Sequence, residues 1–231
     1  MGSLILRPTE TISSSHTKYP SGSLAHNCVN EASSDGDSTY LQQSVSSTTN
    51  TNVDSRLRFS GKFPSKHCTI TKITVYATAK TSTTSLANRR VNYILHNING
   101  VAETSTNIKY DLTTSYATYS KTIDNAVAGM QLLIQNDGTI TFEATVRTVG
   151  QKGTGSKASS GTLRVTQFYF IIEYEEIIES LLVKVNGKYE NITKMFVKEN
   201  GVWVQKNLKE WFQGKSNNSK FGYIYGGDLD E

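Results

Sequence analysis

Cysteine is scarce in this chain, and its placement excludes several classes of site. The 231 residues include two cysteines, Cys28 and Cys68, and neither stands in a CxxC or CxxH spacing. This excludes zinc-ribbon and thioredoxin-like motifs. We expect two free thiols in a protein assembled in a reducing cytoplasm, and the long separation is also compatible with a disulfide.

Long apolar runs and dense charge are absent as well. No segment approaches the roughly 20 apolar residues of a membrane span. The opening residues, Met1 to Pro8, lack the apolar core of a signal peptide. We therefore expect synthesis in a cytoplasm and no contact with a membrane. The net charge of +4 contains no dense Lys/Arg run, so charge indicates no nucleic-acid partner.

The motifs of common catalytic and cofactor sites are missing too. The four histidines, His16, His26, His67 and His96, are scattered and form no HExxH motif. There is no Gly-x-Ser-x-Gly nucleophile elbow and no glycine-rich phosphate loop before a helix. The sequence therefore predicts a protein that is not an enzyme, with no catalytic, cofactor-binding or metal-ligating residue. His96 is expected at the surface.

Serine, threonine, asparagine and aromatic residues take the place of the missing charge. The chain has 12 tyrosines and eight phenylalanines, and its hydrophobic share is only 36%. Thr and aromatic side chains favour pleated strands, whereas Ser and Asn favour turns. Apolar and polar residues alternate over 71–80 and 139–147, which predicts half-buried strands. Shorter strands are expected at 4–7, 38–43, 56–59, 91–96 and 116–123. The pattern predicts an all-β fold, an antiparallel β-sandwich of jelly-roll-like kind with a small C-terminal β-hairpin module.

Two further stretches complete the sandwich. Met130, Leu132 and Ile134 alternate with glutamines, and Asn136-Asp137-Gly138 is a turn sequence, so 130–147 is predicted to be a β-hairpin. Residues 163–174 are apolar on both faces from Phe168 onward. This predicts a central strand that is covered on both sides, or one that contacts a second module.

Composition changes after Tyr174, which places a domain boundary there. We predict a β-sandwich domain over 1–175, a two-hairpin docking module over 176–213 and an extended tail over 214–231. Two Asn-Gly pairs, at 186–187 and 200–201, each follow an apolar stretch and signal tight hairpins. A unit this small buries too little surface to be stable alone. Its aromatic side chains are therefore candidate partner-docking residues: Tyr189, Phe196, Trp203, Trp211 and Phe212.

Two groups of residues in the sandwich are candidate sites with alternative interpretations. The stretch Asp35-Gly36-Asp37 is a turn, a structural cation site, or a carboxylate pair of the kind that glycosidases use. The second group is glycan-facing if its rings lie exposed on one face, because aromatic rings stack on sugars; otherwise it fills the core and the edges. Its members are Tyr19, Tyr76, Tyr116 and Tyr119.

Several short motifs resemble a known family. The opening Leu4-Ile5-Leu6-Arg7-Pro8, the pair Asn30-Glu31 and the stretch Asp35-Gly36-Asp37-Ser38-Thr39-Tyr40 resemble the N-terminal β-sandwich of structural proteins from phages and prophages of Gram-positive bacteria. The stretch 164–174 looks like the closing strand of that domain. The C-terminal stretches 184–187 and 200–204 are similar to the Asn-Gly-x-Trp hairpins of phage virion proteins. Gly36 departs from the consecutive Asp residues of the family pattern.

The resemblance implies a virion component without catalytic activity. Such a protein is made in the host bacterial cytoplasm and displayed on the particle as a homo-oligomer. We therefore expect an accessory structural protein of a tailed phage that docks on other virion proteins through its C-terminal module. It is a capsid decoration or head-fibre protein, or a tail or neck component. The alternative is an adhesin of the phage tail that binds a glycan or another molecule of the bacterial surface.

Overall fold

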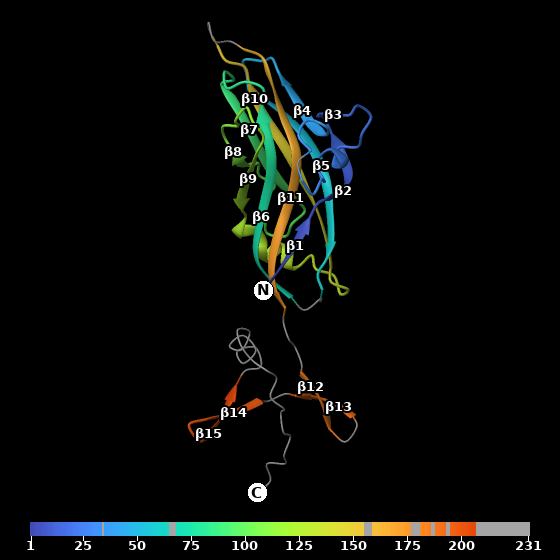
Figure 1. Cartoon of the computed structure of the whole chain (residues 1–231), viewed down its shortest axis with the longest axis vertical. Helices are drawn as coiled ribbons and strands as arrows, with labels where there is room; N and C mark the ends of the chain where they lie inside the picture. Colours follow the sequence, from blue (N-terminus) through green and yellow to red (C-terminus); the bar gives the residue numbers. More distant parts are fainter. Residues whose placement is uncertain are drawn as a thin grey trace. The chain divides into compact units, whose positions relative to one another are not determined.

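A computed structural model describes residues 1–33, 35–64, 68–154, 159–176, 181–185, 188–192 and 195–206. The chain divides into two compact units, Met1–Glu175 (unit 1) and Glu176–Glu231 (unit 2), and its regular structure is almost entirely β (Figure 1). The elements of unit 1, the last of which ends at the boundary, are β1 (Gly2–Leu6), β2 (Pro8–Ser14), β3 (Thr17–Tyr19), η1 (His26–Cys28), β4 (Tyr40–Val45), β5 (Thr51–Lys62), β6 (Cys68–Thr81), β7 (Asn88–His96), β8 (Thr106–Lys109), β9 (Ala117–Thr122), η2 (Asp124–Ala126), α1 (Val127–Gln131), β10 (Thr139–Gln151) and β11 (Gly161–Glu176).

Unit 1 is a sandwich of two sheets. Sheet A has the strand order β3-β4-β11-β6-β9, and β1 pairs with the second half of β11. Sheet B has the order β2-β5-β10-β7-β8. Neighbouring strands run antiparallel in both sheets. The predicted all-β, jelly-roll-like sandwich is confirmed.

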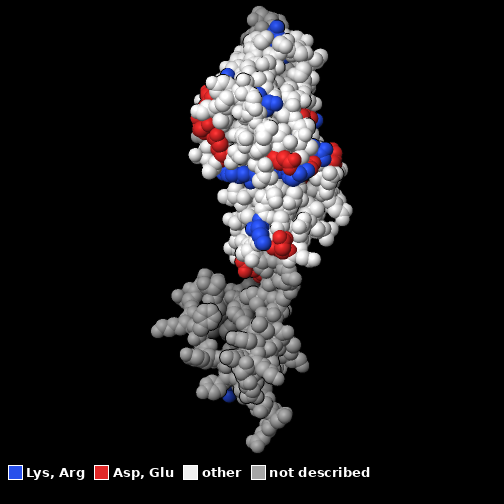
Figure 2. All heavy atoms as spheres, turned by 90° about the vertical axis from the view of Figure 1, so that its right-hand side faces the viewer, with Lys and Arg blue, Asp and Glu red and all other residues white. Residues whose placement is uncertain are grey.

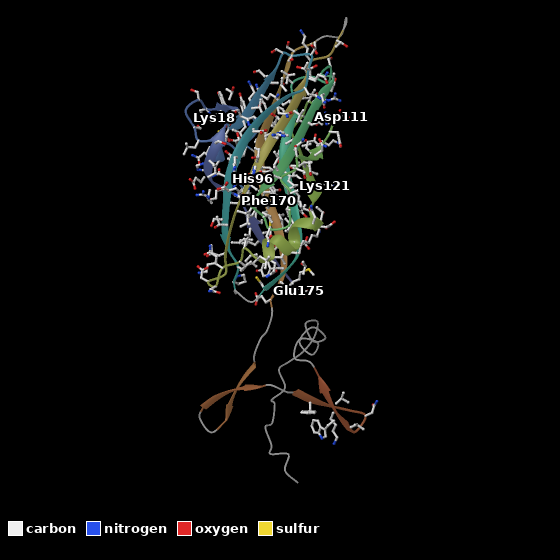
Figure 3. All side chains as sticks on the ribbon, turned by 180° about the vertical axis from the view of Figure 1, so that it is seen from behind. Lys18, His96, Asp111, Lys121, Phe170 and Glu175 are labelled. Atoms are coloured by element: carbon white, nitrogen blue, oxygen red, sulfur yellow. The ribbon has the colours of Figure 1, made fainter. Side chains whose placement is uncertain are left out.

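Four phenylalanines form the centre of the core between the sheets. Phe59 of β5 and Phe142 of β10 belong to sheet B, and their rings stack with centroids 5.3 Å apart. Phe168 and Phe170 of β11 contact Phe59 edge to face at 5.8 and 5.0 Å. Figure 3 labels Phe170 near the middle of unit 1. Because both sheets supply rings to one cluster, these side chains hold the layers together.

The alternation of inward and outward side chains on β11 is interrupted halfway along the strand. Val165 and Phe168 both point into the core, although strict alternation would put them on opposite faces. At this irregularity the backbone N–H of Phe168 donates to the carbonyl of Val29 at 3.0 Å, and Asn30 forms a bridge to Gln167. The segment after η1 thereby reaches sheet A between β4 and β1.

The position of β11 inside sheet A agrees with the predicted central strand. Its outer face is only partly covered, because Tyr169 and Ile171 keep intermediate solvent exposure. The apolar run of β11 therefore reflects one face buried in the core of the two-sheet sandwich and an outer face that is partly covered.

The predicted hairpin over 130–147 is wrong in its first half. α1 and the turn after it occupy the place of the first strand, and only β10 is extended. Met130 is fully buried, whereas Leu132 is 68% exposed. Burial at Met130, one helical turn after Val127, follows the period of a helix rather than the alternation of a strand.

α1 packs closely on the elements around it. A Cβ on Gly129 would lie 2.2 Å from the backbone oxygen of Asn99, so glycine allows the helix to lie directly on that loop. The Gln131 side chain accepts a hydrogen bond from the Ile70 N–H at 2.7 Å and donates to the Cys68 carbonyl at 2.9 Å. This amide satisfies two backbone groups at the start of β6.

The described residues of unit 2 form two hairpins, and the small C-terminal β-hairpin module of the predicted fold is confirmed. β12 (Leu181–Val185) pairs with β13 (Lys188–Ile192), and β14 (Met195–Glu199) pairs with β15 (Val202–Lys206). Asn200 and Gly201 have φ of +51° and +86°, as a two-residue turn with two left-handed positions requires. The predicted tail, 214–231, lies outside the described residues.

Candidate functional site

The outer face of sheet A carries a row of aromatic and cationic side chains that crosses its strands. Tyr19 of β3 lies opposite Tyr40 of β4, and Gln42, two residues along β4, lies opposite Arg164 of β11. Side chains two residues apart on a strand share a face, so these four side chains lie together. Further along the sheet, Ala79 of β6 pairs with Ala117 of β9, which sets their chain neighbours side by side. We name these residues the outer row: Tyr19, Tyr40, Arg164, Lys80 and Tyr116.

Ring and cation contacts link the members of the outer row. The rings of Tyr19 and Tyr40 stack with centroids 4.8 Å apart. The Arg164 guanidinium lies 4.4 Å from the Tyr40 ring centroid, and the Lys80 ammonium lies 4.3 Å from that of Tyr116. Each cation is thus paired with an aromatic face, an arrangement that is attractive and holds the side chains in place.

Asp37, from the loop before β4, lies at the centre of the outer row. Its Oδ1 accepts hydrogen bonds from Arg164 Nη1 at 2.7 Å and from the Tyr116 hydroxyl at 3.0 Å. Its Oδ2 accepts a hydrogen bond from Lys80 Nζ at 2.7 Å. One carboxylate therefore binds two cations and a phenol that come from three separate parts of sheet A.

These contacts favour the ionised form of Asp37. The hydrogen bond from Lys80, supported by that from Arg164, lowers the pKa of the Asp37 carboxyl to about 2. Burial and the adjacent carboxylate raise the pKa of Tyr116, so its hydroxyl keeps its proton and remains a donor at neutral pH. The arrangement is a receptor for one carboxylate group.

The loop that carries Asp37 is attached to the sheet mainly through side chains. Gln167 Nε2 donates to the Glu31 carbonyl at 3.0 Å, and Arg7 donates to the same oxygen. Within the loop, the Asp35 carboxylate accepts from the N–H and the hydroxyl of Thr39 at 3.3 and 3.1 Å. The two carboxylates thus have different tasks: Asp35 closes a local turn, and Asp37 contacts the sheet.

A second group of stacked rings lies further along the same face, and we name it the second ladder. The rings of Tyr169 and Tyr76 stack with centroids 4.9 Å apart and an interplanar angle of 2°. The Arg7 guanidinium lies 4.8 Å from the Tyr169 centroid. The outer face of sheet A therefore carries two groups of aromatic residues, the outer row and the second ladder, and in each group a cation lies over an aromatic ring.

The structure brings three of the four candidate glycan-facing tyrosines to one face. Tyr19 and Tyr116 belong to the outer row, and Tyr76 belongs to the second ladder. Tyr119 lies opposite Ala77 of β6 and packs partly against the core. Its hydroxyl is 3.0 Å from the hydroxyl of Thr113. Tyr119 is therefore separated from the other three by the sheet.

The candidate docking residues lie in unit 2. Phe196 is 42% exposed and Trp203 is 59% exposed, and the Lys198 ammonium lies 5.8 Å from the Trp203 ring centroid. Tyr189 is a residue of β13 whose side chain is not described, and Trp211 and Phe212 lie outside the described residues.

The three interpretations of the Asp35-Gly36-Asp37 stretch can be compared with this geometry. Gly36 has φ +74°, as a turn requires. Asp37 already faces Lys80 and Arg164, and cationic neighbours oppose metal binding. In the described part of the chain, no group of three or more His, Cys, Asp or Glu side chains could hold a metal ion. The turn is the interpretation that the geometry supports.

His96 is buried, and its predicted surface position is wrong. It is 9% exposed, its Nε2 lies 2.8 Å from the Thr145 hydroxyl, and its Nδ1 lies 3.2 Å from a carboxylate oxygen of Glu103. The loop after β7 covers the outward-facing ring, which Figure 3 shows near mid-height of unit 1. His96 lines a hollow of about 160 Å³ together with Arg58 and Glu143.

Cys28, the last residue of η1, carries a thiol that lies in the hydrophobic core. It is fully buried, and its Sγ lies 3.6 Å from the Tyr19 carbonyl and 3.5 Å from that of Leu24. Burial raises its pKa, so the thiol stays protonated and unreactive. Cys28 and Cys68 are not joined by a disulfide in this structure.

Some charges on the described surface form ion pairs, such as Lys72 with Glu173 and Arg58 with Glu10. On the face shown in Figure 2, some Lys and Arg lie beside Asp and Glu, others stand apart from them, and broad areas carry no charge. Among the helices of the described residues, none has the length and apolar character needed to cross a membrane.

Comparison with known proteins finds no family model that matches and no curated protein that matches. A solved structure described as "CBM4 structure and function" is 12% identical, covers 74% of this chain and 95% of its own, and has a TM-score of 0.32. The carbohydrate-binding module TmCBM27, described for specific mannan recognition, is 11% identical, covers 75% of this chain and 99% of its own, and has a TM-score of 0.32. A structure of infectious bursal disease virus Gx strain is 12% identical, covers 61% of this chain and 36% of its own, and has a TM-score of 0.25. Likenesses at these TM-scores carry no argument about the function of this chain.

Proposed function

We propose that this chain is a non-enzymatic accessory structural protein of a tailed-phage particle, a capsid decoration or head-fibre protein or a tail or neck component. Unit 2 docks on other virion proteins, and unit 1 is displayed. The protein is made in the host bacterial cytoplasm and acts in the virion as a homo-oligomer. The observation that carries the proposal is the exposed aromatic surface of the hairpin β14–β15.

The register of this hairpin gathers its aromatic side chains on one face. Lys198 lies opposite Trp203, and Phe196 lies two residues before Lys198, so the three side chains share a face. Phe196 and Trp203 on this face are 42% and 59% exposed. A two-stranded hairpin has no second layer of its own to cover such a face. Aromatic residues are enriched in the buried centres of protein interfaces, so a partner protein is the expected cover.

The state of the best carboxylate candidate supports a role without catalysis. A glycosidase pair needs one carboxyl that carries a proton and one ionised carboxylate that is free to act as base or nucleophile. Both oxygens of Asp37 already accept hydrogen bonds from Lys80, Arg164 and Tyr116. Lys80 and Arg164 hold Asp37 in its ionised form, with a pKa of about 2. Asp35 hydrogen-bonds to Thr39 instead of approaching the same point.

Trp203→Ala should strongly reduce the amount of this protein on purified particles. Removing an aromatic anchor at the centre of an interface costs about 2 kcal/mol or more, which corresponds to a loss of roughly thirtyfold in affinity. The measurement is a quantitative immunoblot of particles assembled in the presence of the variant protein. Tyr110→Ala is the matched control, because Tyr110 is an aromatic residue of unit 1 that is 61% exposed. Normal incorporation of the Phe196→Ala, Trp203→Ala double variant would overturn the docking role of unit 2.

A second candidate function is binding of a bacterial surface glycan through the outer face of sheet A. The observation that favours it is the outer row, which ends at the strand β3 with Tyr19 still 48% exposed. Half-exposed tyrosine next to fixed polar groups provides both a ring surface and hydrogen-bonding hydroxyls for a sugar.

An array of bacterial surface glycans should therefore yield hits with the full-length protein. Tyr19→Ala should weaken those hits about tenfold, since it removes the ring at the end of the row. Tyr110→Ala, beside the other sheet, should leave them unchanged. An array without hits at high protein concentration would count decisively against this second function.

A further inference from the structure

Three donors fixed on sheet A converge on one carboxylate. Arg164 belongs to β11, Lys80 to β6, and Tyr116 directly precedes β9. They bind the two oxygens of Asp37 separately, at 2.7 Å and 3.0 Å on Oδ1 and at 2.7 Å on Oδ2. The donors therefore form a preorganised carboxylate site, whereas the carboxylate itself comes from a loop.

The charges in this site do not balance. Two cations, Lys80 and Arg164, face the single negative charge of Asp37. Their side chains are only 18% and 27% exposed, whereas that of Asp37 is 50% exposed. Partly buried cations attract anions more strongly than fully solvated ones, because water screens them less. The site thus keeps a net positive charge toward solvent at the place where Asp37 is most accessible.

Exchange of Asp37 for an outside carboxylate conserves the number of hydrogen bonds. Each contact that Asp37 releases can be made again, donor by donor, by the incoming group. The Asp35–Thr39 contacts that close the local turn do not involve Asp37 and need not break. The free energy of exchange is therefore small before the remainder of a ligand adds its own contacts.

The groups next to the site fit a sugar. On one side of Arg164 the outer row continues with Tyr40, which is only 9% exposed and packs against the guanidinium, and with Tyr19, which is 48% exposed. The Gln42 Oε1 accepts a hydrogen bond from the Arg164 Nε at 2.9 Å. The phenol hydroxyl of Tyr19 and the amide of Gln42 are partners for sugar hydroxyl groups. We propose that Lys80, Arg164 and Tyr116 bind the carboxylate of an acidic sugar, a hexuronate, and that Asp37 fills this site when the ligand is absent. The proposal rests on the second function above, glycan binding by this face.

Isothermal titration calorimetry of the full-length protein with trigalacturonate tests the proposal, and fully methyl-esterified trigalacturonate serves as its neutral counterpart. Asp37→Ala should bind the acid about tenfold more tightly than the unaltered protein, because the competing carboxylate is gone. It should bind the ester at least about tenfold more weakly than the acid. Asp37→Asn, which keeps the size of the side chain, provides a second variant should the loop rearrange in Asp37→Ala.

Asp35→Asn is the matched control. It removes the same charge from the same loop, keeps a side-chain oxygen that can accept from Thr39, and leaves the site filled, so its affinity for the acid should equal that of the unaltered protein. Adding Arg164→Gln to Asp37→Ala should abolish the gain.

The outcomes separate this proposal from the one on which it rests. If neither Asp37 variant binds the acid, or if acid and ester bind equally well, the carboxylate site is wrong, while glycan-array hits of the unaltered protein would still support glycan binding. An absence of binding in both experiments overturns both.

Discussion

Phe59→Ala should lower the free energy of unfolding of the sandwich by about 4 kcal/mol. Phe59 is fully buried and contacts three other rings, Phe142 at 5.3 Å, Phe168 at 5.8 Å and Phe170 at 5.0 Å. Its removal leaves a cavity between the sheets, because the backbones of β5 and β11 are fixed by pairing with other strands and cannot close on the space. The lost ring contacts add to the cost.

Urea unfolding followed by far-UV circular dichroism measures this change. Both tryptophans belong to unit 2, at 203 and 211, whereas the circular dichroism signal comes from the strands of the sandwich itself. Tyr110→Ala is a suitable control because its ring is 61% exposed, and its effect should stay within about 0.5 kcal/mol. A loss of under about 1 kcal/mol for Phe59→Ala would mean that the two layers do not pack through this residue.

Acidification from pH 7 to pH 5 should destabilise the sandwich by about 2 kcal/mol through His16 alone. The His16 ring is 3% exposed and is held between the hydroxyls of Ser55, 2.8 Å from Nδ1, and Thr148, 2.9 Å from Nε2. Burial lowers the pKa of His16 to about 4, although the nearby Asp54 acts in the opposite direction. The folded state therefore favours the neutral ring.

The sign follows from the two pKa values. An unfolded histidine takes up its proton near pH 6.5, well before the buried one does. Stability is therefore complete above the unfolded pKa and falls as the pH drops toward the folded pKa of about 4. Over that whole range the loss approaches about 3 kcal/mol.

His16→Gln tests the assignment, because glutamine keeps hydrogen-bonding capacity but does not titrate. Its stability at pH 7 will be lower, yet the slope of stability between pH 7 and pH 5 should nearly vanish. His26, whose pKa burial also lowers, remains in both proteins and cancels in the comparison. An unchanged slope would assign the pH dependence to other groups.

Local alternation was sufficient to predict most strands of the sandwich. Lys72, Tyr76 and Lys80 fall on the polar side of the 71–80 pattern, and they face outward on β6. The error at 130–135 has a local cause, because apolar residues at Met130 and at 133–134 satisfy a short helix as well as a strand. What decided between them was the contact of α1 with β6 and with the loop at Asn99.

The outer row was only half visible in the sequence. Tyr19 and Tyr116 belong to the one group of candidate glycan-facing tyrosines, whereas Asp37 belongs to a separate candidate turn, cation site or carboxylate pair. Their meeting depends on the pairing of β3 with β4 and of β6 with β9, and register between distant strands has no local signal. Lys80 and Arg164 looked like ordinary charges on strand patterns, and Tyr119 could be separated from Tyr116 and Tyr76 only by knowing which side of the sheet it faces.

β11 also has a mechanical consequence. It is 16 residues long, carries Arg164 near its start, and ends at Glu176, where unit 2 begins. If both proposed functions hold, a pull between a ligand at Arg164 and a particle at unit 2 runs lengthwise along this one strand. β4 and β1 flank it on one side and β6 on the other, so tension loads many backbone hydrogen bonds in shear instead of opening them one after another. Rupture under load depends on the unfolding rate. Because β11 is hydrogen-bonded to neighbouring strands along both edges, we expect the strand that would connect ligand to particle to unfold slowly under load.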